Sequence, residues 1–230
     1  MATLRILSAG AAQAVTERII EAFRRDTGND VAAEFSAVGA MKARVTAGES
    51  VDIIILTQAM IDELIAGGLV AQGSRFDLGR VGTGVAVRAG TPAPDVSNAE
   101  ALRKTILASA RLVCPDPAVA TAGKVVMGLM DKLGIAQDVN GRITFFPNGY
   151  ATMSWLAASD LGITQVTEIL PNKGVTYAGP LPDAFQMKAV YSAGIARKAA
   201  EPQLAKRFID RFAAPSARAM LAEAGYELDP

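Results

Sequence analysis

The sequence predicts an α/β fold of two lobes, each built around a parallel sheet, and three observations lead to that prediction. First, a short apolar run, a turn of small residues and a helical pattern follow one another three times within residues 4–66, as in βαβ units. Second, residues 81–88 alternate and carry glycines, which is typical of a long strand that crosses between lobes. Third, a further strand–helix series follows, and residues 186–195 form another alternating run that would cross back.

The first three strand–helix units are expected to form most of the first lobe. After the first strand, apolar residues recur at i, i+4, i+7 and i+8, which predicts an amphipathic helix. Gly28 and Asn29 would end that helix. Strands are expected at residues 4–8, 31–36 and 51–56, and helices along the stripe Val15, Ile19, Ala22 and Phe23 and at residues 41–47 and 58–66.

The second lobe is expected to repeat this organisation between the two crossing strands. The two helices at the end of the chain would return to the first lobe, so its predicted range is 1–81 together with 196–230, and the second lobe takes 82–195. Strands are expected at residues 111–114, 143–146 and 161–165, and helices at 121–133, at 150–157, along the stripe Leu204, Phe208 and Phe212, and at 216–224.

Composition excludes several kinds of chemistry. Lys and Arg number 23 and Asp and Glu number 23, so the net charge is zero and no basic footprint for nucleic acid exists. The absence of histidine removes Ser-His-Asp triads, Cys-His dyads and the usual zinc sites. The one cysteine, Cys114, follows a strand-like run and is interpreted as a small buried hydrophobe. Neither a metal nor a cofactor is expected.

Membrane and export signals do not stand out in the sequence. No run of about 18 apolar residues is present, so no span is expected. The first residues lack the charged, apolar and cleavage regions of a signal peptide, which favours a cytoplasmic protein as the sequence stands. The alternative is a periplasmic protein from which a signal peptide has been removed.

The turns between strands and helices carry the functional signal. Each offers small side chains and the free N–H groups of a helix start, an arrangement that favours anions and lets a ligand approach the backbone closely. A single turn of this kind is more readily explained as tight packing, but four turns around one predicted cleft favour a binding site. The candidate ligand-binding residues are Ser8, Gly10, Ala11, Ser36, Gly39, Ala40, Thr121, Ala122, Gly123, Asn148, Gly149, Tyr150 and Gln165.

The order and spacing of several segments resemble the periplasmic molybdate-binding-protein family, the type II solute-binding proteins of ABC importers. The resemblance spans nearly the whole chain and implies a two-lobed, hinged binder with a double crossover and a central ligand cleft. An ABC permease would be its partner if the protein is exported. The segments that carry the resemblance are residues 4–23, 46–55, 116–117 with 122–123, 161–163, and 179–182 before the run 191–194.

Three positions depart from that family's pattern. Molybdate binders present serine hydroxyls where this chain has Ala11 and Gly39, and a tyrosine that often caps the oxyanion falls near Gln165. Because a site built to hydrogen-bond an oxyanion loses affinity when its polar partners are missing, a carboxylate or larger organic anion is the more plausible ligand. Replacement hydroxyls or amides could come from Ser8, Ser36, Thr121, Thr57 and Gln58.

Other residues are assigned structural roles in the first instance. Arg44 and Lys42 could reach a carboxylate, but a solvated helix face is favoured for both. Trp155 is assigned to the core and Asp52 to capping a neighbouring element, whereas Tyr150 is expected at the cleft.

Three functions fit the sequence. The first is a binding protein for a small anion, without catalysis. The second is an isomerase of an unsaturated di- or tricarboxylate such as aconitate, an activity known within this broad family, which would need a carboxylate, a lysine or Tyr150 as base. The third, a ligand-sensing domain, is the weakest, since no DNA-binding segment precedes Leu4.

Overall fold

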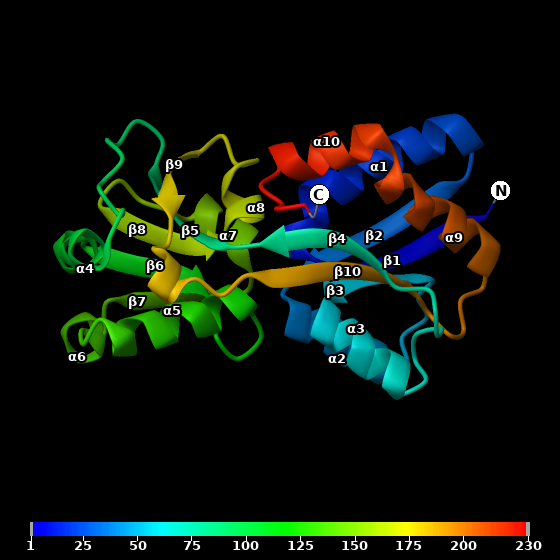
Figure 1. The fold of residues 1–230 in the computed structure, drawn as a ribbon, viewed down its shortest axis with the longest axis horizontal. Helices are drawn as coiled ribbons and strands as arrows, with labels where there is room; N and C mark the ends of the chain where they lie inside the picture. Colours follow the sequence, from blue (N-terminus) through cyan, green and yellow to red (C-terminus); the bar gives the residue numbers. More distant parts are fainter. Residues whose placement is uncertain (1, 229–230) are drawn as a thin grey trace. The chain divides into compact units, whose positions relative to one another are not determined.

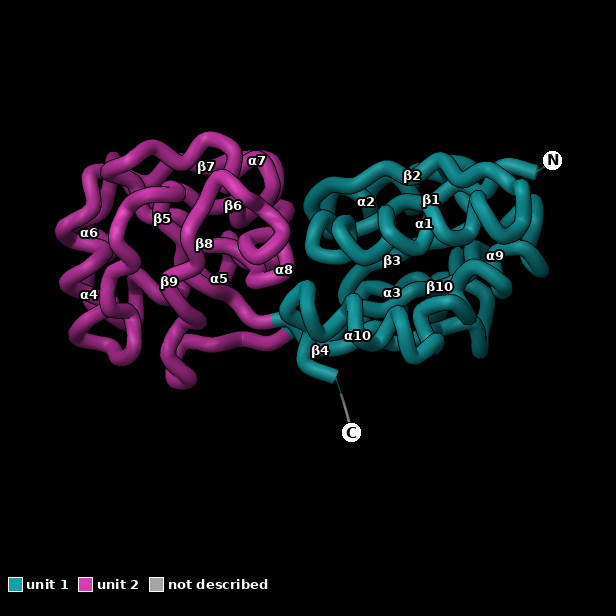
Figure 2. Tube along the Cα trace, turned by 90° about the horizontal axis from the view of Figure 1, so that it is seen from above, with its two compact units in different colours: residues 1–81, 189–230 teal, residues 82–188 magenta. Residues whose placement is uncertain are grey.

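The structure, a computed structural model, describes residues 2–228 and divides into two compact units. Unit 1 holds residues up to Val81 and from Ala189 onward, and unit 2 holds Gly82–Lys188. The chain therefore passes between the units twice, at residues 81–82 and 188–189 (Figure 2). Each unit contains one five-stranded sheet with its own hydrophobic core, which confirms the predicted α/β class. The sheets are mixed and not parallel throughout as predicted, because the strands at residues 189–195 and 83–88 pair antiparallel with their neighbours.

Unit 1 is built on a sheet of strand order β2-β1-β3-β10-β4. The first three strands are parallel, and β10 joins them to β4 through antiparallel pairing on both sides. Figure 1 shows α1 and α10 over one face of this sheet and α2 and α3 over the other. The strands are β1 (Thr3–Ala9), β2 (Asp30–Ser36), β3 (Ile53–Thr57), β4 (Phe76–Val81) and β10 (Ala189–Ile195), and the helices are η1 (Gly10–Ala12), α1 (Gln13–Thr27), α2 (Val38–Thr46), α3 (Gln58–Ala66), α9 (Pro202–Ile209), η3 (Asp210–Ala213) and α10 (Pro215–Glu223).

Unit 2 is built on a sheet of strand order β7-β6-β8-β5-β9. Strand β6 is parallel to β7 and β8, whereas β5 is antiparallel to β8 and β9. The strands are β5 (Thr83–Arg88), β6 (Arg111–Pro115), β7 (Ile143–Phe146), β8 (Asp160–Gln165) and β9 (Val175–Pro180), and the helices are α4 (Ala99–Ala108), α5 (Thr121–Lys132), α6 (Ala136–Val139), α7 (Gly149–Ser154), α8 (Val166–Ile169) and η2 (Asp183–Phe185).

The helices that end the chain complete the core of unit 1. The Phe208 ring packs edge-on against Phe23 of α1, with 5.2 Å between the ring centroids, and against Phe212 at 6.0 Å. The predicted apolar stripe Leu204, Phe208 and Phe212 is therefore buried and runs from α9 into η3, and Phe208 packs against the apolar face of α1. Gly28 ends α1 with a positive φ of 69°, as expected for a glycine at that position.

The second crossing lies earlier in the chain than the sequence indicated. Residues 189–195 were expected in the second lobe, but as β10 they pair with β3 and β4 and belong to unit 1. The alternating pattern of a strand does not reveal which sheet will accept it. Strands β4 and β9 and helix α4 were not predicted; α4 begins where Asn98 accepts hydrogen bonds from the backbone N–H groups of Glu100 and Ala101.

Two single-residue assignments were confirmed and one was wrong. Cys114 is fully buried, and burial raises the pKa of its thiol to about 12, so it packs as a hydrophobe. Asp52 is buried and accepts hydrogen bonds from backbone N–H groups of other elements. Trp155, assigned to the core, is 69% exposed, because α7 ends at Ser154 and the indole lies beyond the helix.

Removing the Asp52 carboxylate is expected to destabilise unit 1. Its oxygens accept from the N–H of Arg5 at 2.8 Å, of Ala200 at 2.8 Å and of Glu201 at 3.4 Å, which ties β1 to the segment that leads into α9. Asp52→Ala leaves these donors without an acceptor, so we expect the free energy of unfolding to fall by about 2 kcal/mol in urea denaturation. Asp52→Asn, which keeps one acceptor oxygen, should lose less; equal losses would show that the hydrogen bonds contribute little.

Candidate functional site

Two of the predicted turns lie side by side in unit 1. Strands β1 and β2 are parallel and end at paired residues, Ala9 opposite Ser36, so the helical segments after them begin at one edge of the sheet. Within residues 2–228, no side chain caps the start of η1, α1 or α2. The first hydrogen bond within α2 runs from the Met41 N–H to the Ala37 carbonyl. The N–H groups that precede it in α2, including that of Gly39, therefore remain available as donors.

The side chains around the first turn are already engaged. Ser8 is fully buried, and its hydroxyl donates to the carbonyl of Ala9 at 3.1 Å. The Ala11 carbonyl accepts a hydrogen bond of 3.0 Å from the Tyr226 hydroxyl, which fixes the turn against the C-terminal segment. Gly10 and Ala11 are buried within η1, whereas Ser36, Gly39 and Ala40 are half-buried. An anion at the turn after β1 would therefore meet backbone donors and not the Ser8 hydroxyl.

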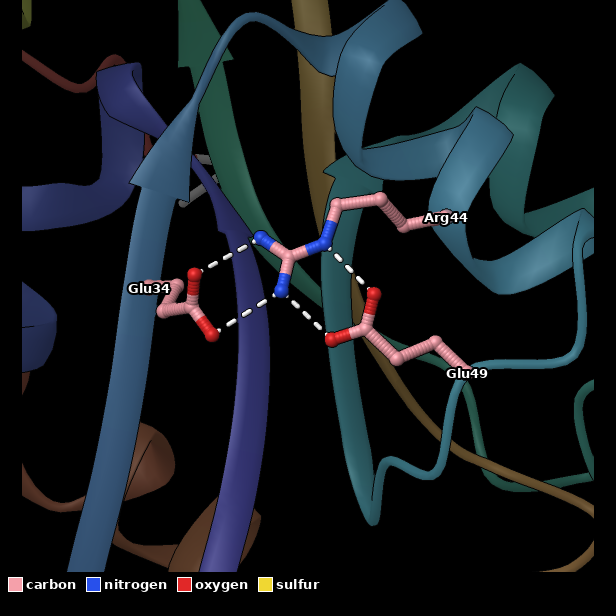
Figure 3. A network of polar contacts seen from close by, with 3 residues as sticks. All are labelled: Glu34, Arg44 and Glu49. Carbon is pink, nitrogen blue, oxygen red and sulfur yellow. Dashed lines mark hydrogen bonds and ion pairs between the residues drawn. The ribbon is translucent and has the colours of Figure 1, made fainter.

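The two cations of α2 are held by carboxylates of unit 1. The Arg44 guanidinium lies between two glutamates, with Nη1 2.8 Å from Glu34 Oε2 and Nε 2.6 Å from Glu49 Oε2 (Figure 3). The hydrogen bonds from Arg44 hold the pKa of both carboxyl groups below the usual value, and Lys42 pairs with Glu63. These contacts match the expected solvated helix face.

In unit 2, the turn before α5 combines open donors with tight packing. No side chain of the described residues caps α5. The first hydrogen bond of this helix runs from the Lys124 N–H to the Ala120 carbonyl, so the N–H groups of Thr121 and Ala122 have no acceptor within the helix. A Cβ at Gly123 would lie 2.3 Å from the Pro115 carbonyl oxygen. Gly123 thus lets α5 approach the end of β6, which is a packing role.

The turn before α7 holds a carboxylate of the protein itself. Asn148 accepts a hydrogen bond of 2.8 Å from the Ala151 N–H and so caps α7. The Gly149 N–H donates to the carboxyl group of Glu168, which also accepts a 2.6 Å hydrogen bond from the Thr164 hydroxyl. A Cβ on Gly149 would lie 1.8 Å from Glu168 Oε2. The donor predicted for a ligand here is therefore occupied by Glu168, a residue that sequence reasoning missed.

Burial dominates the electrostatics of Glu168. Burial raises the pKa of its carboxyl group to about 7, while the hydrogen bonds from Thr164 and from the N–H groups of Gly149 and Gln165 act in the opposite direction. No charged side chain of the described residues contributes to the shift. Unit 2 therefore contains an acid that titrates close to neutral pH.

Unsatisfied polar side chains gather at the end of β8. Gln165 is the last residue of that strand and only 2% exposed, and neither atom of its amide has a hydrogen-bond partner within residues 2–228. The same holds for the buried hydroxyls of Thr83 and Thr167. Gln165 was a predicted ligand residue, whereas the two threonines were missed; Thr83 stands in a Gly-Thr-Gly run too short to predict a nucleotide loop. Tyr150 is half-buried on α7.

The residues that the structure describes contain neither a membrane span nor a metal cluster. None of the helices combines the length and the apolar character that a membrane span requires. The described side chains also contain no group of three or more Asp, Glu, Cys or His residues placed to hold a metal ion.

The two five-stranded units match the type II periplasmic-binding-protein class of structures. The chain belongs to the bacterial extracellular solute-binding protein family, whose pattern matches residues 4–227. Aconitate isomerase from a Pseudomonas species is 26% identical over 99% of this chain and 88% of that protein. The periplasmic molybdate-binding protein of Azotobacter vinelandii has a TM-score of 0.82 at 21% identity, over 99% of this chain and 100% of that one. The sulfate-binding protein of Mycobacterium tuberculosis has a TM-score of 0.74 at 17% identity, over 100% and 88% of the two chains.

Proposed function

We propose that the protein binds a small organic anion, a carboxylate, through backbone N–H groups and uncharged side chains. The observation that carries this proposal is the pair of uncapped helical starts at the ends of β1 and β2, beside cations that are already held by glutamates. Neutral donors at helix starts stabilise an anion without a buried counter-charge. Membership in a solute-binding family supports a small ligand.

A carboxylate is favoured over an inorganic oxyanion by the donors that this chain lacks. Ala11 and Gly39 offer no hydroxyl, and the Ser8 hydroxyl is engaged with Ala9. Fewer fixed hydroxyl donors would weaken the binding of a tetrahedral oxyanion. If the protein is exported, it would pass its ligand to an ABC permease.

A second candidate function is isomerisation of an unsaturated di- or tricarboxylate. The full-length similarity to an aconitate isomerase favours it. The reaction would move one allylic proton from carbon to a base of the protein and return it to the other end of the allylic system, so no cofactor is required. Incubating the protein with cis-aconitate and following the isomers by proton NMR distinguishes turnover from binding alone.

The ligand class is tested by thermal unfolding against molybdate, sulfate, succinate, tricarballylate, citrate and aconitate. A true ligand at a hundredfold excess over its Kd should stabilise the fold by about 2.7 kcal/mol. We expect carboxylates to shift the unfolding midpoint and molybdate to shift it little. A sub-micromolar Kd for molybdate in calorimetry would contradict the proposal.

The position of the site is tested at the start of α2. Gly39→Leu places a bulky side chain among the free N–H groups of α2 and should weaken binding of the best carboxylate by at least about tenfold, a loss of about 1.4 kcal/mol. Glu21→Leu on the exposed face of α1 is the matched control and should leave the affinity unchanged. Circular dichroism verifies that both variants fold. Unchanged affinity in Gly39→Leu would place the ligand elsewhere.

A further inference from the structure

Gln165 is a buried amide that the fold leaves unsatisfied. It is 2% exposed, and its Oε1 and Nε2 atoms have no hydrogen-bond partner among the described residues. A buried polar atom without a partner costs about 1–3 kcal/mol, and native proteins keep few of them. A ligand group that bonds to this amide would remove that cost.

Thr83 lies directly opposite Gln165 in the antiparallel pair of β5 and β8. Opposite residues in such a pair place their side chains on the same face of the sheet, so the hydroxyl and the amide are neighbours. The Thr83 hydroxyl is also fully buried and has no hydrogen-bond partner in the part of the chain that the structure describes. Its backbone is fixed, because the Thr83 N–H donates to Gln186 Oε1 at 3.0 Å and its carbonyl accepts from Gln186 Nε2 at 2.6 Å.

The chemistry of these two side chains selects their partner. The amide edge presents one donor and one acceptor side by side, and the hydroxyl can act as either. An oxyanion or a plain carboxylate only accepts, so it would leave Gln165 Oε1 facing another oxygen. An α-hydroxycarboxylate carries a donor hydroxyl next to an acceptor oxygen, which complements both atoms of the amide.

The surroundings of Gln165 add to this preference. Its backbone N–H donates to the buried carboxyl group of Glu168, and no charged side chain contributes to the field at that carboxyl group. Ionised Glu168 would repel a carboxylate that occupied both atoms of the amide more strongly than a ligand that brings one carboxylate oxygen to Nε2 and a hydroxyl group to Oε1. A hydroxyl in that place carries no net charge.

We infer that Thr83 and Gln165 form a subsite for the hydroxyl group of an α-hydroxycarboxylate ligand, an inference that rests on the proposed carboxylate-binding function. Thr83 hydrogen-bonds the ligand hydroxyl, which donates to Gln165 Oε1. Gln165 Nε2 donates to the adjacent carboxylate oxygen. The subsite thereby distinguishes hydroxy acids from acids of the same shape that lack the hydroxyl group.

Two matched pairs of acids test the inference. Citrate differs from tricarballylate, and malate from succinate, by one hydroxyl group in each pair. Calorimetry on the wild-type protein should give a Kd at least about 30-fold lower for the hydroxy acid in at least one pair, since a site built for a hydroxyl group discriminates strongly against its absence. The wild-type comparison needs no variant.

Two isosteric variants locate the discrimination. Thr83→Val and Gln165→Met remove the polar atoms and keep the volume, and both should fold, because replacing unsatisfied buried polar atoms with apolar groups is close to neutral. In each, the ratio of the two Kd values should fall below about threefold, through loss of affinity for the hydroxy acid. The control is Thr144→Val, which makes the same change at a threonine of β7 in unit 2 and should keep the wild-type ratio of Kd values.

The possible failures are distinguishable. If no carboxylate binds, the proposed function fails and the inference fails with it. If carboxylates bind but both pairs give equal Kd values in the wild-type protein, only the inference is overturned. A wild-type preference that persists in both Thr83→Val and Gln165→Met would also overturn it, because the hydroxyl group would then be recognised elsewhere.

Discussion

Replacing Gly149 with alanine is expected to lower the free energy of unfolding by about 4 kcal/mol. A Cβ at this position would lie 1.8 Å from Glu168 Oε2 and 2.3 Å from Thr164 Oγ1, far inside van der Waals contact. Glu168 cannot move aside freely, because its carboxyl group is buried and hydrogen-bonded to Thr164. The expected loss is the sum of about 3 kcal/mol from overpacking and about 1 kcal/mol from one lost hydrogen bond. Urea denaturation measures the change in the free energy of unfolding.

Gly128→Ala is the control for that substitution. Gly128 lies within α5, and a Cβ there would meet nothing within 4 Å. The same change should therefore stabilise the protein by about 1 kcal/mol through helix propensity. The double variant Gly149→Ala with Glu168→Ala should lose less than the sum of the two single variants, because the clash with the Glu168 carboxyl group is removed. Additive losses would show that Glu168 is not the obstacle.

The stability of the protein is expected to fall between pH 5 and pH 8 because of Glu168. The pKa of this carboxyl group is about 7 in the folded protein, raised by burial above the ordinary value of 4.5. The folded state therefore binds the proton more tightly than the unfolded state, and the stabilisation is fully present below about pH 4.5. It is lost as the pH rises through 7. At about 1.4 kcal/mol for each tenfold change in proton affinity, the loss is about 3 kcal/mol.

The measurement compares the wild-type protein with Glu168→Gln across this range. The difference between the two removes the contributions of other carboxyl groups, such as Glu34 and Glu49, whose lowered pKa values affect stability at more acid pH. Tyr177 on β9 does not interfere, because burial raises the pKa of its hydroxyl above an already high value. We expect the variant to gain about 3 kcal/mol relative to the wild-type protein from pH 5 to pH 8. Parallel pH profiles would contradict the titration of Glu168.

The structural roles of two single residues followed from the sequence, and the role of a third did not. Cys114 in an apolar run and Asp52 at the start of a buried strand were assigned correctly, since their neighbours in the chain fix their surroundings. Trp155 was assigned to the core because helical spacing was extended past residue 154, where the helix in fact ends. A large apolar side chain favours burial, but whether it is buried depends on whether another element packs over it. Trp155 lies just past the end of a helix, and sequence patterns do not show whether anything covers such a position.

The sequence by itself determined the alternation of strands and helices and the small-residue turns after β1, β2 and β6. These features depend on periodicity and on turn residues, which act over a few residues along the chain. Only the tertiary structure decided that β10 joins the sheet of unit 1, that Glu168 occupies the turn at Gly149, and that Thr83 lies opposite Gln165. Each of these depends on the pairing of segments distant in sequence, where register and burial select the neighbours and local patterns carry no record of the partner.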